Sequence, residues 1–288
     1  MDSIQSILST LTKTKRLERG LGSVMAAVHP GDPSIGTLSI PVGDPSILRQ
    51  GEDWLRAQGC QRVWGPMEGC TWFSYRANLG PVETPLFFKE VEASPEPWVS
   101  SGYSQVAEYF SSQVDSRQVL ERTSDRIQKA ESLGWQIRSF DSDSLEEELR
   151  QCHRISHSAF QEALGYAPIP EKLFVGLYAP LLGQVPVELL LVASDESGRI
   201  GGYCLCFPDI SAPESRRFVV KSLAIDPSAQ RASLGTALLA AAHQRALAMG
   251  LDGGAIYALM HSDTHSIAIS EKAGGVVFRR YGLFEKRL

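Results

Sequence analysis

The stretch that decides the fold is SLAIDPSAQRASLGTALLAAAHQRALAMG, residues 222–250. It continues an apolar run that predicts a buried strand, and it ends in a helix rich in alanine and leucine. The loop between them is built from small side chains. Such a loop either only connects the two elements or holds phosphate oxygens, because the first N–H groups of a helix lack partners.

Pyrophosphate needs several N–H donors that converge on one volume, together with side chains small enough to let the phosphates approach. The small residues of the loop meet this need, two longer side chains add donors, and the helix adds its positive dipole end. The residues expected to form this cradle are Gln230, Arg231, Ala232, Ser233, Leu234, Gly235, Thr236 and Ala237.

The elements around this stretch predict one central sheet. Before it, the sequence indicates a strand at 135–141, two helices at 145–165 and 170–183, and a strand hairpin at 187–210. The strand at 216–226 and the long helix follow. A strand at 254–260, a short helix at 264–275 and a final strand at 276–288 complete the chain. The order is typical of an α/β fold.

The first half repeats the latter part of this order in weaker form. Strands are expected at 22–30 and 36–43, then a helix at 44–59, a strand at 60–67 and, after an irregular segment, a strand at 102–112. A polar helix at 116–134 bridges the halves. We therefore divide the chain into 1–130 and 131–288. Either duplication or the chance regularity of an α/β chain explains the repeated order.

The segment SLAIDPSAQRASLGTALL resembles the acyl-CoA-binding segment of the GCN5-related N-acetyltransferases (GNAT), in which a strand, a Gln/Arg-x-x-Gly-x-Gly/Ala loop and a helix follow one another. Gln230 matches the first position and Gly235 the last, while Ser233 replaces the usual inner glycine. If that position needs a positive φ, serine costs about 1–2 kcal/mol there. The resemblance implies that residues 230–237 hold the pyrophosphate. It also implies that the backbone of Leu223, Ala224 and Ile225 binds the pantetheine arm.

The resemblance further implies the architecture. The fold class expected is α/β, with a GNAT-like mixed, mostly antiparallel central sheet flanked by helices, in two tandem GNAT-like halves. The first half is then a degenerate module, because Asp44 stands where phosphates need donors. Its irregular aromatic segment, residues 63–80, is either core or the lining of an acceptor pocket that faces the second half.

The catalytic residues are less well marked. SEKAGG aligns with the family's last helix, which places Asp263 or Thr264 at an asparagine position and Ser270 where a tyrosine often protonates the thiolate. Ser270, acting through water, and Tyr281 are the candidates for that acid. His261 is the first candidate for the base that deprotonates the amine, with Asp263 next.

We therefore predict an acyl-CoA-dependent N-acyltransferase, with acetyl-CoA or another acyl-CoA as co-substrate and a small-molecule amine as acceptor. The amine attacks the thioester directly, and backbone N–H groups polarise its carbonyl. The alternative is a non-catalytic acyl-CoA sensor or scaffold with the same fold. Acylation of oxygen or sulfur is a third possibility, and the oligomeric state stays open.

The amino-acid composition argues against some classes of binding partner. A net charge of −5 argues against a nucleic-acid binder, and the sequence has no apolar run of membrane-spanning length, so we expect no membrane partner and a cytoplasmic location. Five cysteines without CxxC spacing predict neither disulfides nor structural zinc. His153 and His157 lie at helical spacing but lack a third ligand, so no metal is expected. His243, within the long helix, is expected to be solvated.

Overall fold

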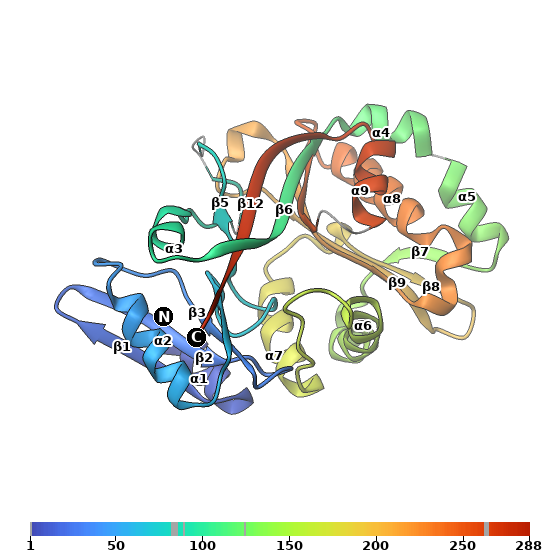
Figure 1. Cartoon of the computed structure of the whole chain (residues 1–288). Coiled ribbons are helices and arrows are strands. Elements are labelled where there is room, and N and C mark those ends of the chain that lie inside the picture. The colour runs from blue at the N-terminus through green and yellow to red at the C-terminus, as the bar shows by residue number, and fades with distance from the viewer. Residues whose placement is uncertain (1, 82–85, 89, 124, 262–264) are drawn as a thin grey trace.

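The computed structural model describes residues 2–81, 86–88, 90–123, 125–261 and 265–288. Figure 1 shows the whole chain, with the first half in blue to green and the second in yellow-green to red. The elements of the first half are α1 (Asp2–Leu11), β1 (Thr14–Arg19), β2 (Gly22–Val28), β3 (Ile35–Leu38), α2 (Ile47–Ala57), β4 (Arg62–Gly65), β5 (Ala77–Asn78), α3 (Glu96–Ser100), β6 (Ser104–Val114), α4 (Ser116–Thr123) and α5 (Asp125–Ser132).

The second half follows the order that the sequence predicts: strand, two helices, three strands, helix, strand, helix, strand. Its elements, with short 3-10 turns marked η, are β7 (Gln136–Ser139), η1 (Ser142–Ser144), α6 (Leu145–Phe160), α7 (Glu171–Leu182), η2 (Val187–Leu189), β8 (Leu190–Ser194), β9 (Ile200–Pro208), η3 (Pro213–Ser215), β10 (Phe218–Ile225), η4 (Pro227–Ala232), α8 (Leu234–Ala248), β11 (Ala255–His261), α9 (His265–Lys272) and β12 (Val276–Arg287).

The described strands form one sheet of twelve, in the order β1-β2-β3-β4-β12-β6-β11-β10-β9-β8-β7, with β5 paired to β12. Among the pairings in this part of the chain, β3 with β4 and β10 with β11 are parallel and the others are antiparallel. The predicted fold class, a mixed and mostly antiparallel sheet flanked by helices, is therefore confirmed. The sequence analysis missed β1, because TKRLER is a polar edge strand without apolar alternation.

The last strand of each half lies beside the other half. β6 pairs with β11 on one side and with β12 on the other, and β12 in turn pairs with β4. Figure 1 shows β12 running from α9 towards the first half, where both chain ends lie. Each half thus contributes a strand to the middle of the common sheet. The division at 130/131, which falls within α5, stays a prediction. One continuous sheet joins the two halves.

Helices cover both faces of the second-half sheet. On one face α8 packs against α4 and α5 over the largest core cluster. On the other face the buried stripe of α6, with Leu149, Cys152 and Ile155, joins Phe174 of α7 in a second cluster. In the first half α2 packs Ile47, Leu48 and other apolar residues against β2 and β3.

His243 corrects one expectation. It is fully buried, and its ring nitrogens hydrogen-bond the hydroxyls of Ser116 and Tyr257 at 2.8 and 2.9 Å. Burial lowers its pKa to about 4. The expectation of a solvated histidine was wrong because α8 is apolar on all sides and α4 covers the face on which His243 lies.

Candidate active site

Strands β10 and β11 separate part of the way along their length. They pair only over Phe218–Val220 and Ala255–Tyr257, in parallel. Beyond that point β10 stays bonded to β9 as far as Ile225, and β11 stays bonded to β6 as far as His261. Each strand therefore has an edge of amide and carbonyl groups that faces the other without a ladder between them, within the residues described. An extended chain can bond such an edge.

The edge of β10 leads directly to the start of α8. After η4, Ser233 takes φ +56° and ψ 29°, and α8 begins at Leu234 without a side-chain cap at Ser233. Ser233 is thus in the left-handed region, where glycine is favoured, and this is the position at which the related family usually has its inner glycine. The first N–H groups of α8 consequently lie at the end of the open strand edge.

Gly235 leaves room at this helix start. A Cβ added there would meet only side-chain atoms of Ile225 and Leu223, at 3.6 Å or more, which is ordinary van der Waals contact. The Cα of Gly235 therefore faces Leu223 and Ile225 of β10, with room there for a methyl group. The backbone of residues 223–237 fits the donor set that a pyrophosphate and its attached chain require. The side chains of Gln230, Arg231 and Ala232 lie outside what the structure describes.

The corresponding part of the first half is closed. β3 and β4 are parallel, as β10 and β11 are, but the chain after β4 turns back onto β3. The N–H of Met67 donates to Leu38 O at 2.7 Å, and that of Gly69 donates to Thr37 Oγ1 at 3.1 Å. The Asp44 carboxylate accepts the N–H and hydroxyl of Ser46 at the start of α2. A carboxylate and a folded-back chain occupy the place where phosphates and pantetheine would need donors.

Two of the three predicted catalytic residues lie in one row across the sheet. His261 on β11 is opposite Tyr109 on β6, and Tyr109 is opposite Tyr281 on β12. The rings of Tyr109 and His261 meet edge to face, with centroids 4.9 Å apart. Residues directly opposite on antiparallel strands share a face, so these side chains lie on the same side of the sheet. His261 is at the end of β11, beside the open edge of β10.

Ser270 does not join this row. It is buried on α9, and its hydroxyl hydrogen-bonds that of Ser112 at 2.5 Å. Tyr281 contacts Ser111, the neighbour of Ser112 on β6. Since successive residues of a strand point to opposite faces, Ser270 and Tyr281 lie on opposite sides of the sheet. Asp263 and Thr264, the other sequence candidates, lie outside the described residues.

Tyr281 belongs to a buried polar cluster. Its hydroxyl donates to Glu90 Oε1 at 2.8 Å, and the same oxygen accepts from Arg279 Nε at 3.0 Å. Burial is the main cause that raises the pKa of Tyr281 well above its usual range. The Tyr281 hydroxyl therefore keeps its proton, which it directs at Glu90 in a hydrogen bond, and it releases that proton with difficulty. The sequence did not indicate Glu90, which follows the aromatic segment without any motif of its own.

The aromatic segment of the first half contacts the second half through several side chains, among them Trp72 and Arg76. Trp72 Nε1 donates to Ala167 O at 2.7 Å, and the Trp72 ring meets Phe174 of α7 edge to face. Arg76 places its guanidinium over the ring of Tyr281, 4.8 Å from the centroid. The segment thus lies next to the row of His261, Tyr109 and Tyr281.

The cysteines and the histidines of α6 have the following surroundings. Cys204 and Cys206 are buried in the core as small apolar fillers, and all five cysteines are free. His153 bonds Ile169 O and His157 bonds the Tyr166 hydroxyl. Among the described residues no group of three metal-ligating side chains forms. Within that same part of the chain, every helix is too short or too polar to cross a membrane.

Comparison with known proteins places these features in a family. Residues 143–274 match the model of the acetyltransferase (GNAT) family. No curated protein sequence matches the chain.

Solved structures match the whole chain in fold. A GCN5-related N-acetyltransferase from Sphaerobacter thermophilus is 15% identical, with a TM-score of 0.57 over 98% of this chain and 85% of that one. A tandem GNAT protein from the clavulanic acid biosynthesis pathway is 10% identical, with a TM-score of 0.54 over 99% and 87% of the two chains. The C-terminal domain of a putative lysylphosphatidylglycerol synthetase from Agrobacterium fabrum is 12% identical, with a TM-score of 0.50 over 99% and 88%.

These matches show which fold the chain has. They do not identify an acceptor substrate, because the names of the similar proteins describe different functions. The family match spans α6 to α9 and includes the open edge of β10 and the start of α8. The structural matches include the first half as well, which is consistent with a second GNAT-like module there. The chain therefore carries an acetyltransferase (GNAT) family domain at residues 143–274, within a fold shared with tandem GNAT proteins.

Proposed function

We propose that the protein is an acyl-CoA-dependent N-acyltransferase that transfers an acyl group, acetyl in the first instance, to a small-molecule amine. The observation that carries the proposal is the separation of β10 from β11. It leaves the backbone of Leu223–Ile225 open on one edge and directs that edge to the first turn of α8.

The backbone of this region suits the donor molecule. The open edge of β10 offers N–H and carbonyl groups for the amide-rich pantetheine arm, and the start of α8 offers N–H groups for the pyrophosphate. An N–H of the same edge next to the thioester carbonyl stabilises the oxyanion that develops during attack. The small side chains at Ser233 and Gly235 keep that volume clear.

His261 is the residue that we propose as base. It ends β11 beside the open edge; the residue is half-buried, and its Nε2 atom faces the interior. The amine nitrogen forms a bond to the acyl carbon, the carbon–sulfur bond breaks, and the amine proton passes to His261, directly or through one water. The Tyr281 hydroxyl donates its proton in a hydrogen bond to Glu90, and Ser270 lies on the opposite face of the sheet from His261. Neither position favours a role as the acid that protonates the leaving thiolate.

The test is thermal unfolding with and without acetyl-CoA in the wild type, Gly235→Glu and Gly235→Ala. A ligand at 100 times its Kd stabilises by about 2.7 kcal/mol, which raises the Tm of a chain of this size by about 5–10 °C. We expect this shift in the wild type and in Gly235→Ala, whose methyl group fits. Gly235→Glu places bulk and negative charge against the phosphates and should lose the shift.

A second measurement separates transfer from binding alone. Release of free thiol from acetyl-CoA in the presence of a panel of amines should exceed release without amine. Absence of any shift with acetyl-CoA or longer acyl-CoAs would overturn the proposal. A shift without amine-dependent thiol release would replace it by the non-catalytic binder.

A further inference from the structure

Three buried hydrogen-bond donors without acceptors surround Tyr281. They are Arg76 Nε, the Tyr109 hydroxyl and Asn78 Nδ2, and none has a hydrogen-bond partner among the described residues. Arg76 is 9% exposed, Asn78 5% and Tyr109 3%. Buried polar groups are nearly always paired, so three unpaired donors in one place indicate a missing acceptor.

The register of the strands brings these donors together. Tyr281 is opposite Tyr109 on one side and opposite Asn78 on the other. Arg76 lies over the Tyr281 ring and bonds the Tyr75 carbonyl through Nη1 at 3.1 Å. All three donors thus lie on the face of the sheet that also carries the Tyr281 ring.

Among the described residues no carboxylate forms an ion pair with the guanidinium of Arg76, although the charge of Glu90 acts on it from a greater distance. No described carboxylate lies within 4.0 Å of its guanidinium, whereas Glu90, the nearby acid, is bonded to Arg279, Tyr281 and the Phe87 N–H. The rings of Tyr75 and Tyr281 flank the guanidinium at 5.4 and 4.8 Å. A buried arginine without an anionic partner is costly, and it is retained where an anion completes it.

The backbone at Arg76 is also unusual. Its φ is +79°, a left-handed conformation that non-glycine residues rarely adopt. The Arg76 N–H donates to Pro66 O, which holds the residue against the chain that follows β4. This conformation turns a charged side chain into the protein instead of towards solvent.

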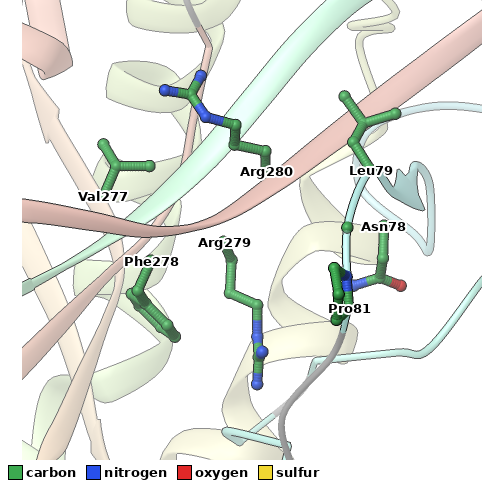
Figure 2. A pocket seen from close by; sticks show the side chains of 8 residues that line it. Asn78, Leu79, Pro81, Val277, Phe278, Arg279 and Arg280 are labelled. Carbon is green, nitrogen blue, oxygen red and sulfur yellow. The ribbon is translucent and has the colours of Figure 1, made fainter.

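A hollow adjoins the cluster. It measures about 210 Å³ and lies between β12 and residues 78–81, with Asn78 and Arg279 in its wall. Figure 2 shows the side chains of Asn78 and Arg279 on the same side of β12, with Arg280 directed to the other side. Space for a small ligand is therefore present next to Asn78, one of the three unpaired donors.

We propose that Arg76, with the Tyr109 hydroxyl and Asn78, binds a carboxylate of the acceptor, so that the substrate is an amine that also carries a carboxylate. The inference rests on the proposed function and names its substrate class. A monoanion matches the single unpaired guanidinium. The planar carboxylate matches the fork of its N–H groups, with a hydroxyl donor beside it. A phosphate dianion would leave negative charge uncompensated among these groups.

The position of the cluster fits this role. Tyr109 lies between Tyr281, which Arg76 covers, and His261, the proposed base. A carboxylate held by Arg76 and Tyr109 leaves the rest of the molecule free to extend along the row towards the open edge of β10. The amine then reaches the thioester while the anionic end stays fixed.

The experiment measures kcat/KM with acetyl-CoA for matched pairs of acceptors. The acids are glycine, β-alanine, 4-aminobutanoate and 5-aminopentanoate, and the partner of each is its carboxamide. In the wild type at least one acid should exceed its amide by about 100-fold, the usual value of a buried charge-assisted hydrogen-bond pair. Arg76→Gln should remove most of this preference and Tyr109→Phe about tenfold of it. Arg287→Gln, at an exposed arginine near the end of the same strand as Tyr281, should leave it unchanged.

Stability and binding measurements separate this site from a structural role and from the proposed function. Arg76→Gln removes an unpaired buried charge, so its Tm without ligand should not fall, and its shift with acetyl-CoA should persist. Equal rates for acids and amides in the wild type would overturn the inference while leaving acyl transfer in place. A large fall in Tm for Arg76→Gln, with an unchanged acid preference in Tyr109→Phe, would also overturn it. If acetyl-CoA neither binds nor reacts, the proposed function fails, and calorimetry with the same acids still tests Arg76 directly.

Discussion

Tyr109 and His261 lie opposite each other on β6 and β11, with their rings edge to face at 4.9 Å. One belongs to the first half of the chain and the other to the second. They meet because β6 is inserted between β11 and β12, so the candidate site is built from both halves. The first half thus contributes a residue to the candidate site.

The left-handed conformation of Ser233 predicts a stabilising substitution. Ser233→Gly removes the Cβ strain of about 1–2 kcal/mol but increases the entropy of the unfolded chain, so a net gain of about 0.5–1 kcal/mol in unfolding free energy is expected. Urea unfolding measures it. Ser233→Ala keeps the Cβ and should bring no gain. Equal stability of the two variants would show that φ at this position carries no strain.

His243 predicts a pH dependence of stability. Burial lowers its pKa to about 4 in the folded state, against about 6.5 when unfolded. Between these pH values the unfolded chain binds more protons, so the free energy of unfolding falls as the pH is lowered, by up to about 1.4 kcal/mol per pH unit. Burial also lowers the pKa of His29, which adds to the same trend. Urea unfolding from pH 7 to pH 4 should show a shallower slope for His243→Gln than for the wild type.

The buried ion pair of Glu90 and Arg279 predicts a large loss on breaking. Both side chains are nearly fully buried, so Glu90→Gln should lower the unfolding free energy by about 3–5 kcal/mol. The matched control is Glu108→Gln, which breaks the exposed Arg280 pair one residue along β12 and should cost less than about 1 kcal/mol. Similar losses in the two variants would contradict the role of burial.

The closed counterpart in the first half predicts one binding site per chain. Calorimetric titration with acetyl-CoA should give a stoichiometry of one, because the chain after β4 and the Asp44 carboxylate fill the place that corresponds to the second-half opening. Asp44→Ala should leave both stoichiometry and affinity unchanged. Two sites, or an affinity that depends on Asp44, would refute this.

β6 and β12, the last strand of each half, pair with strands of the other half, and these pairings predict which fragments fold. A chain of residues 131–288 lacks β6, so β11 loses one partner and β12 loses all of its partners. It should aggregate on expression. A chain of residues 104–288 restores β6 and should remain monodisperse to a greater degree in size-exclusion chromatography. A soluble, acetyl-CoA-binding fragment 131–288 would show that the family domain folds without β6.

The sequence predicted the second half well because its elements are local. Residues 218–248 read as strand, loop and helix from periodicity alone, and the resemblance carried by Gln230 and Gly235 supplied the family. The predicted order of the second half and the fold class are both confirmed. The cradle and the catalytic residues stay predictions.

The features that could not be predicted from the sequence depend on contacts between residues far apart in the chain. Nothing in GYSQVAEYFSSQV indicates that this strand leaves its own half, so Tyr109 was not considered. Tyr281 was chosen as a candidate acid, but its bond to Glu90 depends on a residue that no pattern connects to it. His243 was misread because the cover provided by α4 cannot be seen in the periodicity of α8.

Because β6 and β12 lie between the two halves, the sheet also sets a fixed distance across the candidate site. From His261 through Tyr109 to Tyr281 the site crosses two strand spacings of about 4.8 Å each, so about 10 Å separates the strand of the proposed base from the strand that Arg76 covers. Hydrogen-bonded strands hold this interval, and no hinge can lengthen or shorten it. Selection among acceptors is then a matter of molecular length, decided before any movement of the protein.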